Sequence, residues 1–315
     1  MRTILLLSPV LIVLAAGAWW LWFKPPPLPA VEVVNQAYAT PRPRPEGPLR
    51  VYHLGHSLVG RDMPAMLAQL AGQDHSYESQ LGWGTSLRQH WEPAETINGF
   101  ETENDHAHFR PATEAVNSGE YDAVVLTEMV ELRDAIRYHD SAEYFAKWAD
   151  LARQANPDTA VYLYETWHRL DDPAGWSTRL DTDLGTLWEN KILLPDLAKN
   201  PERPAHVIPA GQVMAEVVAA IAERDDAGQI QKAEDLFAVN DAGEQDQIHL
   251  NDIGNYLVAL THFAVLYGRS PVGLPHNLKR ADGTPAEAPT PEIARLMQET
   301  VWSVVTGYPK TGVAP

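Results

Sequence analysis

A serine, an aspartate and a histidine lie in two short segments whose residue types could together carry out acyl transfer. Ser57 follows Gly55 and His56 directly after the apolar run 49–54, and Asp246 and His249 form an Asp-x-x-His step much later in the chain. A serine hydroxyl attacks an acyl carbon only if a base removes its proton and a carboxylate holds that base in the right tautomer. We therefore expect a hydrolase in which Ser57 is the nucleophile, His249 the general base and Asp246 the orienting carboxylate.

Two simpler interpretations of the same residues stay open. Ser57 could cap the helix that is expected to follow it. Asp246 could belong to a solvated acidic loop with Asp241 and Glu244, in which His249 is incidental. The separation of three residues between Asp246 and His249 favours the catalytic interpretation, because it brings both side chains to one side of a turn.

Short apolar strands alternate with helices from residue 49 onward. This alternation predicts a mostly parallel sheet covered by helices on both faces, which is a three-layer α/β/α fold. Ligands of such sheets bind beyond the carboxyl ends of the strands, and Ser57 lies just past the first one. The expected strands are 50–54, 76–81, 121–126, 159–164 and 205–208, and the expected helices are 62–70, 141–154, 212–224, 252–266 (with Asn251 as N-cap) and 291–306.

Three segments in this order are similar to those of the SGNH (GDSL-type) hydrolases. They are Gly-His-Ser-Leu at 55–58, Gly-Trp-Gly-Thr-Ser-Leu at 82–87 and Asp-Gln-Ile-His-Leu-Asn at 246–251. The resemblance covers roughly residues 49–272. It implies an SGNH-hydrolase, flavodoxin-like fold and ester hydrolysis through an acyl-enzyme, with no metal or cofactor.

The oxyanion of such a reaction needs hydrogen-bond donors. We expect the amide of Ser57 as the first donor and that of Gly84 as the second, because a glycine lets the backbone approach closely. The family typically adds an asparagine in a Gly-x-Asn-Asp step after the third strand, where this chain has Leu-Thr-Glu-Met at 126–129. The hydroxyl of Thr127 or a protonated Glu128 is the expected replacement, since an ionised glutamate only accepts hydrogen bonds.

Further polar and aromatic residues are expected at the crevice. His56 stands where the family commonly has an aspartate, and Glu165 and Trp167 follow another predicted strand, so they form the substrate wall or simply pack there. We expect an ester-bearing small molecule or glycan as substrate, with O-acetyl groups of envelope or extracellular carbohydrate favoured by the tryptophan content. The alternatives are a lipid or thioester hydrolase, an acetyltransferase, and a non-catalytic glycan-binding protein on the same scaffold.

The composition argues against nucleic acid as a partner and excludes sites that need cysteine. The 315 residues carry a formal net charge of −18, and a surface that acidic repels phosphate backbones, so nucleic acid is not an expected partner. The chain has no cysteine, which excludes disulfides, thiolate zinc sites and a cysteine nucleophile. Its sequence leaves the oligomeric state open.

The N-terminal part of the chain has a different character. Residues 4–23 carry no charge and are long enough to cross a bilayer, so residues 1–24 are expected to be a membrane anchor with the catalytic domain outside the cytoplasm. A signal peptide cleaved near the Ala-Gly-Ala at 16–18, which would give a secreted protein, is the alternative. Residues 25–48 are rich in proline and are expected to be an extended linker, followed by one hydrolase domain at 49–315.

Overall fold

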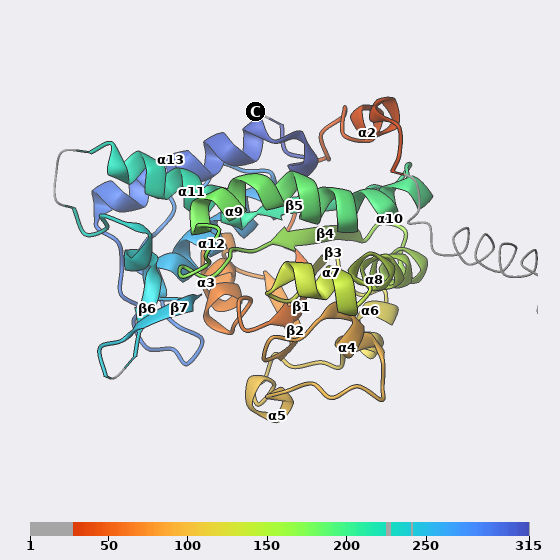
Figure 1. Cartoon of the computed structure of the whole chain (residues 1–315), viewed down its shortest axis with the longest axis horizontal. Helices are drawn as coiled ribbons and strands as arrows, with labels where there is room; N and C mark the ends of the chain where they lie inside the picture. Colours follow the sequence, from red (N-terminus) through yellow and green to blue (C-terminus); the bar gives the residue numbers. More distant parts are fainter. Residues whose placement is uncertain (1–27, 225–227, 241, 315) are drawn as a thin grey trace, which may run out of the picture.

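The central element of the computed structural model is a five-stranded parallel sheet, and the structure describes residues 28–224, 228–240 and 242–314 (Figure 1). The strand order β2-β1-β3-β4-β5 is that of flavodoxin-like folds, with the chain reversing direction across the sheet at β1 and β3. The predicted three-layer α/β/α fold with a parallel sheet is therefore confirmed. The strands are β1 (Arg50–His56), β2 (Ser76–Gly82), β3 (Ala123–Leu126), β4 (Ala160–Glu165) and β5 (His206–Pro209).

Helices cover both faces of this sheet, which explains why nearly every strand residue is buried. One face packs on α3 (Asp62–Ala71), α9 (Trp176–Asp183), α11 (Ala210–Ala222), α12 (Asp252–Tyr267) and α13 (Pro291–Gly307). The other face packs on α4 (Leu87–Trp91), α6 (Ala112–Asn117), α7 (Leu132–Tyr138), α8 (Ser141–Ala155), the π-helical η1 (Leu184–Leu193) and α10 (Leu194–Lys199).

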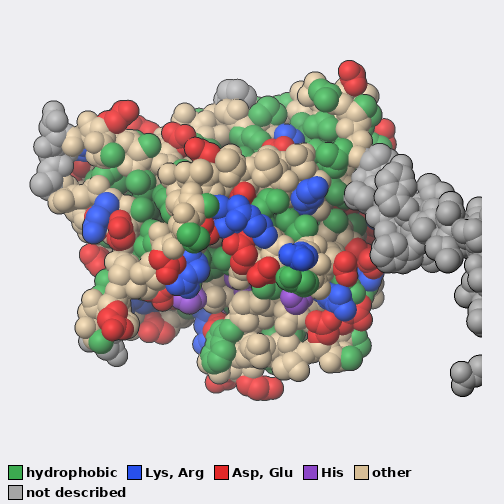
Figure 2. Space-filling model, viewed as in Figure 1, with side chains coloured by type: hydrophobic (Ala, Val, Ile, Leu, Met, Phe, Trp, Pro, Cys, Tyr) green, Lys and Arg blue, Asp and Glu red, His purple; other side chains and the backbone are tan. Residues whose placement is uncertain are grey.

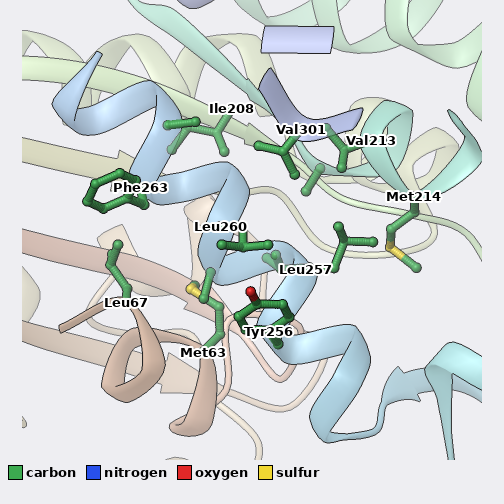
Figure 3. Close-up of a cluster of buried hydrophobic side chains, with 14 of the residues drawn as sticks. Met63, Leu67, Ile208, Val213, Met214, Tyr256, Leu257, Leu260, Phe263 and Val301 are labelled. Atoms are coloured by element: carbon green, nitrogen blue, oxygen red, sulfur yellow. The ribbon is translucent and has the colours of Figure 1, made fainter. Parts of the chain in front are cut away.

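Helix α12 lies at the centre of the first layer. Leu257, Leu260 and Phe263 of this helix are buried between α3 and the elements around Val301 of α13 (Figure 3). Its N-terminus is fixed by the predicted cap, because the side chain of Asn251 accepts a hydrogen bond from the amide of Gly254 at 3.0 Å. The rigid start of α12 matters for function because β7 (Gln245–Leu250), which carries Asp246 and His249, ends directly before it.

The N-terminal part of the described chain differs from the prediction of an extended linker. Val31–Ala37 forms a short helix, α2, which is possible because residues 30–40 contain no proline. The following residues pack on the domain: the hydroxyl of Tyr38 donates to the carbonyl of Ala205 at 2.8 Å, and the amide of Arg42 donates to the carbonyl of Gly312 at 2.7 Å. The prediction of an extended linker is therefore wrong for residues 31–37.

The remaining elements lie at the edges of the three layers. A two-stranded antiparallel sheet joins β6 (Phe237–Val239) to β7, and neither strand was expected from the sequence. Short helices are α5 (Phe100–Glu103), η2 (Ala233–Leu236) and η3 (Pro309–Thr311). The expected anchor at 4–23 lies outside the described residues, and no helix among those described is long and apolar enough to cross a bilayer.

Candidate active site

Ser57 lies in the turn that follows β1, at the carboxyl end of the sheet. The carbonyl of His56 accepts from the amide of Val59 at 2.9 Å, which closes this turn, and the carbonyl of Gly55 accepts from Nε2 of His90 at 2.8 Å. Gly55 is required by the close approach of a neighbouring segment. It lies within β1, where a Cβ would collide with the methyl group of Thr127, so the neighbouring strand can approach only a glycine.

The three predicted catalytic side chains meet across this edge of the sheet. Nε2 of His249 is 3.0 Å from Oγ of Ser57, and Nδ1 of His249 is 2.9 Å from Oδ2 of Asp246. Both distances are those of ordinary hydrogen bonds. The structure therefore joins one segment that follows β1 to another segment in β7, in the order carboxylate, imidazole, hydroxyl.

Asp246 and His249 meet by a different local geometry from the predicted turn. They lie in β7, where residues three apart would normally point to opposite faces of the strand. The pairing of β7 with β6 is irregular, however, and Oδ1 of Asp246 accepts from the amides of Ile248 and His249 at 2.8 and 2.9 Å. The carboxylate thus folds back over the following backbone, as in an Asx-turn, and its other oxygen reaches the imidazole.

The electrostatics of Asp246 suit an orienting carboxylate. Partial burial acts to raise its pKa, but hydrogen bonds from the amides of His249 and Ile248 and from the His249 ring outweigh it and lower the pKa overall. An ionised carboxylate at Nδ1 holds the proton of the imidazole on that nitrogen. Nε2 is then the acceptor that faces the hydroxyl of Ser57.

The predicted oxyanion donors are the backbone amides of Ser57 and Gly84. Gly84 lines the same pocket as Ser57 and His249, and it has a left-handed backbone with φ of 55°, which glycine adopts without strain. Among the described residues no hydrogen bond is found from the amide of either Ser57 or Gly84. The assignment of these amides to the oxyanion remains a prediction.

Neither of the two predicted side-chain replacements for the family asparagine lines the pocket of Ser57 and His249. Thr127 is buried, and its hydroxyl donates its only proton to the carbonyl of Tyr164 at 2.8 Å. Glu128 is also buried, and its Oε1 accepts from the amides of Met129 and Leu87 at 2.8 and 3.3 Å. Burial raises the pKa of Glu128 to about 7, but its side chain lies against the start of α4 and does not line the pocket.

His56 and Glu165 have structural partners. His56 is buried at the base of the pocket, where its Nε2 donates to the carbonyl of Glu128 at 2.9 Å and its Nδ1 accepts from the amide of Leu58 at 3.3 Å. Burial lowers the pKa of His56 to about 4. Glu165 is not a substrate wall, because it accepts hydrogen bonds from the amides of Gly211 and Gln212 at the start of α11, and burial raises its pKa to about 8.

Trp167 bonds the backbone of β7, the strand that carries Asp246 and His249. Its indole is buried, and its Nε1 donates to the carbonyl of Ile248 at 2.7 Å. Three residues later the amide of Leu170 donates to the carbonyl of Gln247 at 2.8 Å. The segment after β4 therefore holds the backbone of β7 between Asp246 and His249. Trp167 also borders a small cavity of about 160 Å³ beside Ser57 and His249.

A larger pocket of about 610 Å³ opens over the catalytic side chains. This volume is in the usual range for small-molecule sites. Its described lining combines apolar and charged side chains: His56, Ser57, Leu58, Trp83, Gly84, Glu103, Val130, Arg169, Ile248 and His249. Sequence reasoning missed Glu103 and Arg169, because neither belongs to a motif. The position of Arg169 shortly after β4 was the one available signal.

Charges of both signs surround this region. Arg169 makes a two-pronged ion pair with Asp171, with nitrogen–oxygen distances of 2.8 and 3.0 Å, and both side chains are about half exposed. Figure 2 shows acidic and basic side chains interspersed over the face viewed, without a large area of one sign. The net charge of −18 is therefore not gathered into one acidic area on this face.

Histidine pairs elsewhere do not form a metal centre. His106 and His108 have ring centroids 6.3 Å apart, and His108 stacks on Tyr77. Over the part of the chain that the structure describes, no group of three or more histidine, cysteine, aspartate or glutamate side chains is arranged to hold a metal ion.

Comparisons with known proteins give one weak structural similarity. No protein-family model matches the chain, and no curated protein matches it. The fold is similar to a crystal structure from Parabacteroides merdae described as a GDSL-like lipase, with a TM-score of 0.40 and 13% sequence identity over 70% of this chain and 95% of that one.

Proposed function

We propose that this protein is a serine ester hydrolase that acts through an acyl-enzyme. The observation that carries the proposal is the hydrogen-bonded series Asp246–His249–Ser57 beneath an open pocket at the carboxyl end of the sheet. Side chains so arranged activate a serine hydroxyl on many unrelated folds.

The proposed reaction has two steps. In the first, Oγ of Ser57 attacks the ester carbonyl carbon while Nε2 of His249 takes its proton, and the amides of Ser57 and Gly84 stabilise the oxyanion. The protonated His249 then gives the proton to the departing alkoxide, which leaves an acyl-enzyme. In the second step water attacks the acyl carbon and gives a proton to His249, which returns it to Ser57 as the acid leaves.

The proposed substrate is an O-acyl, and in particular O-acetyl, ester of envelope or extracellular carbohydrate. Two features support this class. The pocket combines an exposed tryptophan, Trp83, with charged side chains that can hydrogen-bond hydroxyl groups. Residues 4–23 would anchor the chain in a membrane and, on the proposed orientation, place the catalytic domain outside the cytoplasm. Cleavage of this segment would give a secreted enzyme.

Hydrolysis of 4-nitrophenyl acetate and butyrate by the full chain tests the catalytic proposal. Replacing Ser57 or His249 by alanine should lower kcat by about a thousandfold or more, because each removes a member of a unit that acts together. Ser303→Ala, which removes an exposed hydroxyl on α13, is the matched control and should keep full activity. Equal turnover by wild type and both site variants would overturn the proposal.

A second candidate is a glycan-binding protein on the same scaffold. The observation that favours it is the loss of a side-chain oxyanion donor after β3, since both Thr127 and Glu128 are engaged in internal hydrogen bonds. One missing donor typically lowers kcat by about a hundredfold or more. A folded wild-type chain that binds a glycan but hydrolyses none of its esters would favour this candidate.

A further inference from the structure

Trp83 is a large aromatic side chain that remains exposed at the edge of the pocket. It follows β2, lines the same pocket as Ser57 and His249, and has 52% of its surface accessible to solvent. Tryptophan is highly buried on average, so an exposed indole beside a reactive group is informative about binding. Tryptophan is also enriched among the residues that dominate binding energy.

The indole is held in a fixed position from one side. Its Nε1 donates to Oε1 of Glu103 at 2.6 Å, and the amide of Trp83 donates to the carbonyl of Asn98 at 2.7 Å. Gly99 lies against the ring, and a Cβ at Gly99 would overlap the indole atoms. One side of the indole therefore packs on backbone. The accessible surface belongs to a side chain that loses little freedom when a ligand covers it.

The segment that holds the indole is itself tied to the turn of the nucleophile. Arg61, at the end of that turn, donates to the carbonyls of Thr102 and, at 3.3 Å, Glu103. The side chain of Asn104 accepts from the amide of Leu81 at 3.0 Å and donates to its carbonyl at 2.8 Å. The position of Trp83 relative to Ser57 is thus set by hydrogen bonds from both β2 and the nucleophile turn.

We propose that Trp83 is the platform on which the sugar ring of the alcohol part of the ester stacks, with Glu103 and Arg169 as hydrogen-bonding partners of its hydroxyl groups. This inference rests on the proposed ester hydrolase function and assigns the subsite for its leaving group. A pyranose has an apolar C–H face bordered by hydroxyls, which matches an indole bordered by a carboxylate and a guanidinium. A long acyl chain would instead desolvate both charges without offering them a hydrogen bond.

The catalytic test compares two acetate esters that differ only in the alcohol. Methyl glucopyranoside monoacetate carries a sugar ring, and ethyl acetate carries none. In Trp83→Ala, the ratio of kcat/KM for the sugar ester to that for ethyl acetate should fall about tenfold or more, and Trp83→Phe should recover part of it. Tyr138→Ala removes an aromatic residue that is 58% exposed on α7 and outside the pocket, and should leave the ratio unchanged. An unchanged ratio in Trp83→Ala would overturn the proposal.

A binding measurement separates failure of the platform from failure of the catalytic proposal. Saturation-transfer NMR on Ser57→Ala with the same sugar ester should show transfer to the ring protons that is lost in Ser57→Ala/Trp83→Ala. If wild type hydrolyses neither ester, the serine hydrolase proposal fails and this experiment alone decides the platform. Transfer that persists without Trp83, or is absent in its presence, would contradict the platform.

Discussion

The indole N–H of Trp167 donates to the carbonyl of Ile248 at 2.7 Å, and this bond joins the segment after β4 to the strand that carries Asp246 and His249. His249 is nearly half exposed, so its own packing constrains it little. The buried indole N–H of Trp167 bonds the carbonyl of Ile248, the residue before His249. It therefore fixes the backbone from which the His249 ring projects. We therefore interpret Trp167 as a positioning residue for the base, in place of the predicted substrate wall.

Trp167→Phe tests this positioning role. The variant keeps a buried ring and loses the donor, so kcat for 4-nitrophenyl acetate should fall about tenfold or more through a misplaced base. Trp148→Phe is a matched control, because Trp148 is equally buried and donates to the carbonyl of Leu87 at 3.0 Å on the other side of the sheet. Both variants should lose similar stability in thermal unfolding. A fall in kcat as large in Trp148→Phe would show that the effect is not positional.

Asp246→Asn should reduce catalysis while the chain stays folded. An amide in place of the carboxylate cannot hold the proton on Nδ1 of His249, so kcat should fall by about a hundredfold to ten-thousandfold. Asp282→Asn is the control, because Asp282 is exposed and its Oδ1 accepts from the amide and hydroxyl of the nearby Thr284. Circular dichroism should show both variants folded. Near-normal kcat in Asp246→Asn would mean that the carboxylate does not orient the base.

Glu128→Gln tests the conclusion that this side chain is structural. The folded pKa of Glu128 is about 7, above the ordinary value of about 4.3, so the protonated carboxyl favours folding at low pH and this contribution is lost as the pH rises through 7. The neutral amide can accept from Met129 and Leu87 without that loss. Unfolding by urea at pH 8.5 should show the variant more stable by up to about 3 kcal/mol, with kcat within about threefold of wild type. Equal stability of the variant and wild type at pH 8.5 would contradict this account.

The buried histidines predict loss of stability in acid. Burial lowers the pKa of His262 to about 4, so between about pH 6.5 and 4 the unfolded chain binds a proton that the folded chain does not. The contribution of neutral His262 to stability is fully present above pH 6.5. The free energy of unfolding falls by up to about 3 kcal/mol from this group as the pH falls to 4. His262→Phe should flatten this dependence in urea unfolding. His276→Phe, outside the core, controls for the substitution, and an equal slope in His262→Phe and wild type would refute the account.

The sequence predicted the sheet well because buried parallel strands are short apolar runs between helices. It failed where tertiary contacts decide the local structure. Helix α2 was not predicted because prolines flank residues 30–40. Strand β7 was not predicted because residues 245–250 are mostly polar, and the carboxylate of Asp246 within it bonds the following backbone. The order of Ser57, Asp246 and His249 was readable from residue types. The roles of Thr127 and Glu128 were not, because their hydrogen-bond partners come from other elements.

The pocket walls were hardest to predict for a related reason. Exposure of Trp83 depends on the packing of Gly99 and Glu103 against one side of its ring. Arg169 reaches the pocket from a segment that carries no motif. Neither relationship follows from spacing along the chain, since each depends on where separate loops meet at the end of the sheet.

The most direct test of the central claim is covalent labelling of the full chain with a fluorophosphonate, followed by mass spectrometry of the modified peptide. If His249 activates Ser57, a single phosphonyl adduct should form on Ser57 with loss of fluoride. Labelling should be absent in Ser57→Ala and slower by about a hundredfold or more in His249→Ala. A folded wild type that forms no adduct, or one that labels another serine equally fast in Ser57→Ala, would contradict Ser57 as the activated nucleophile.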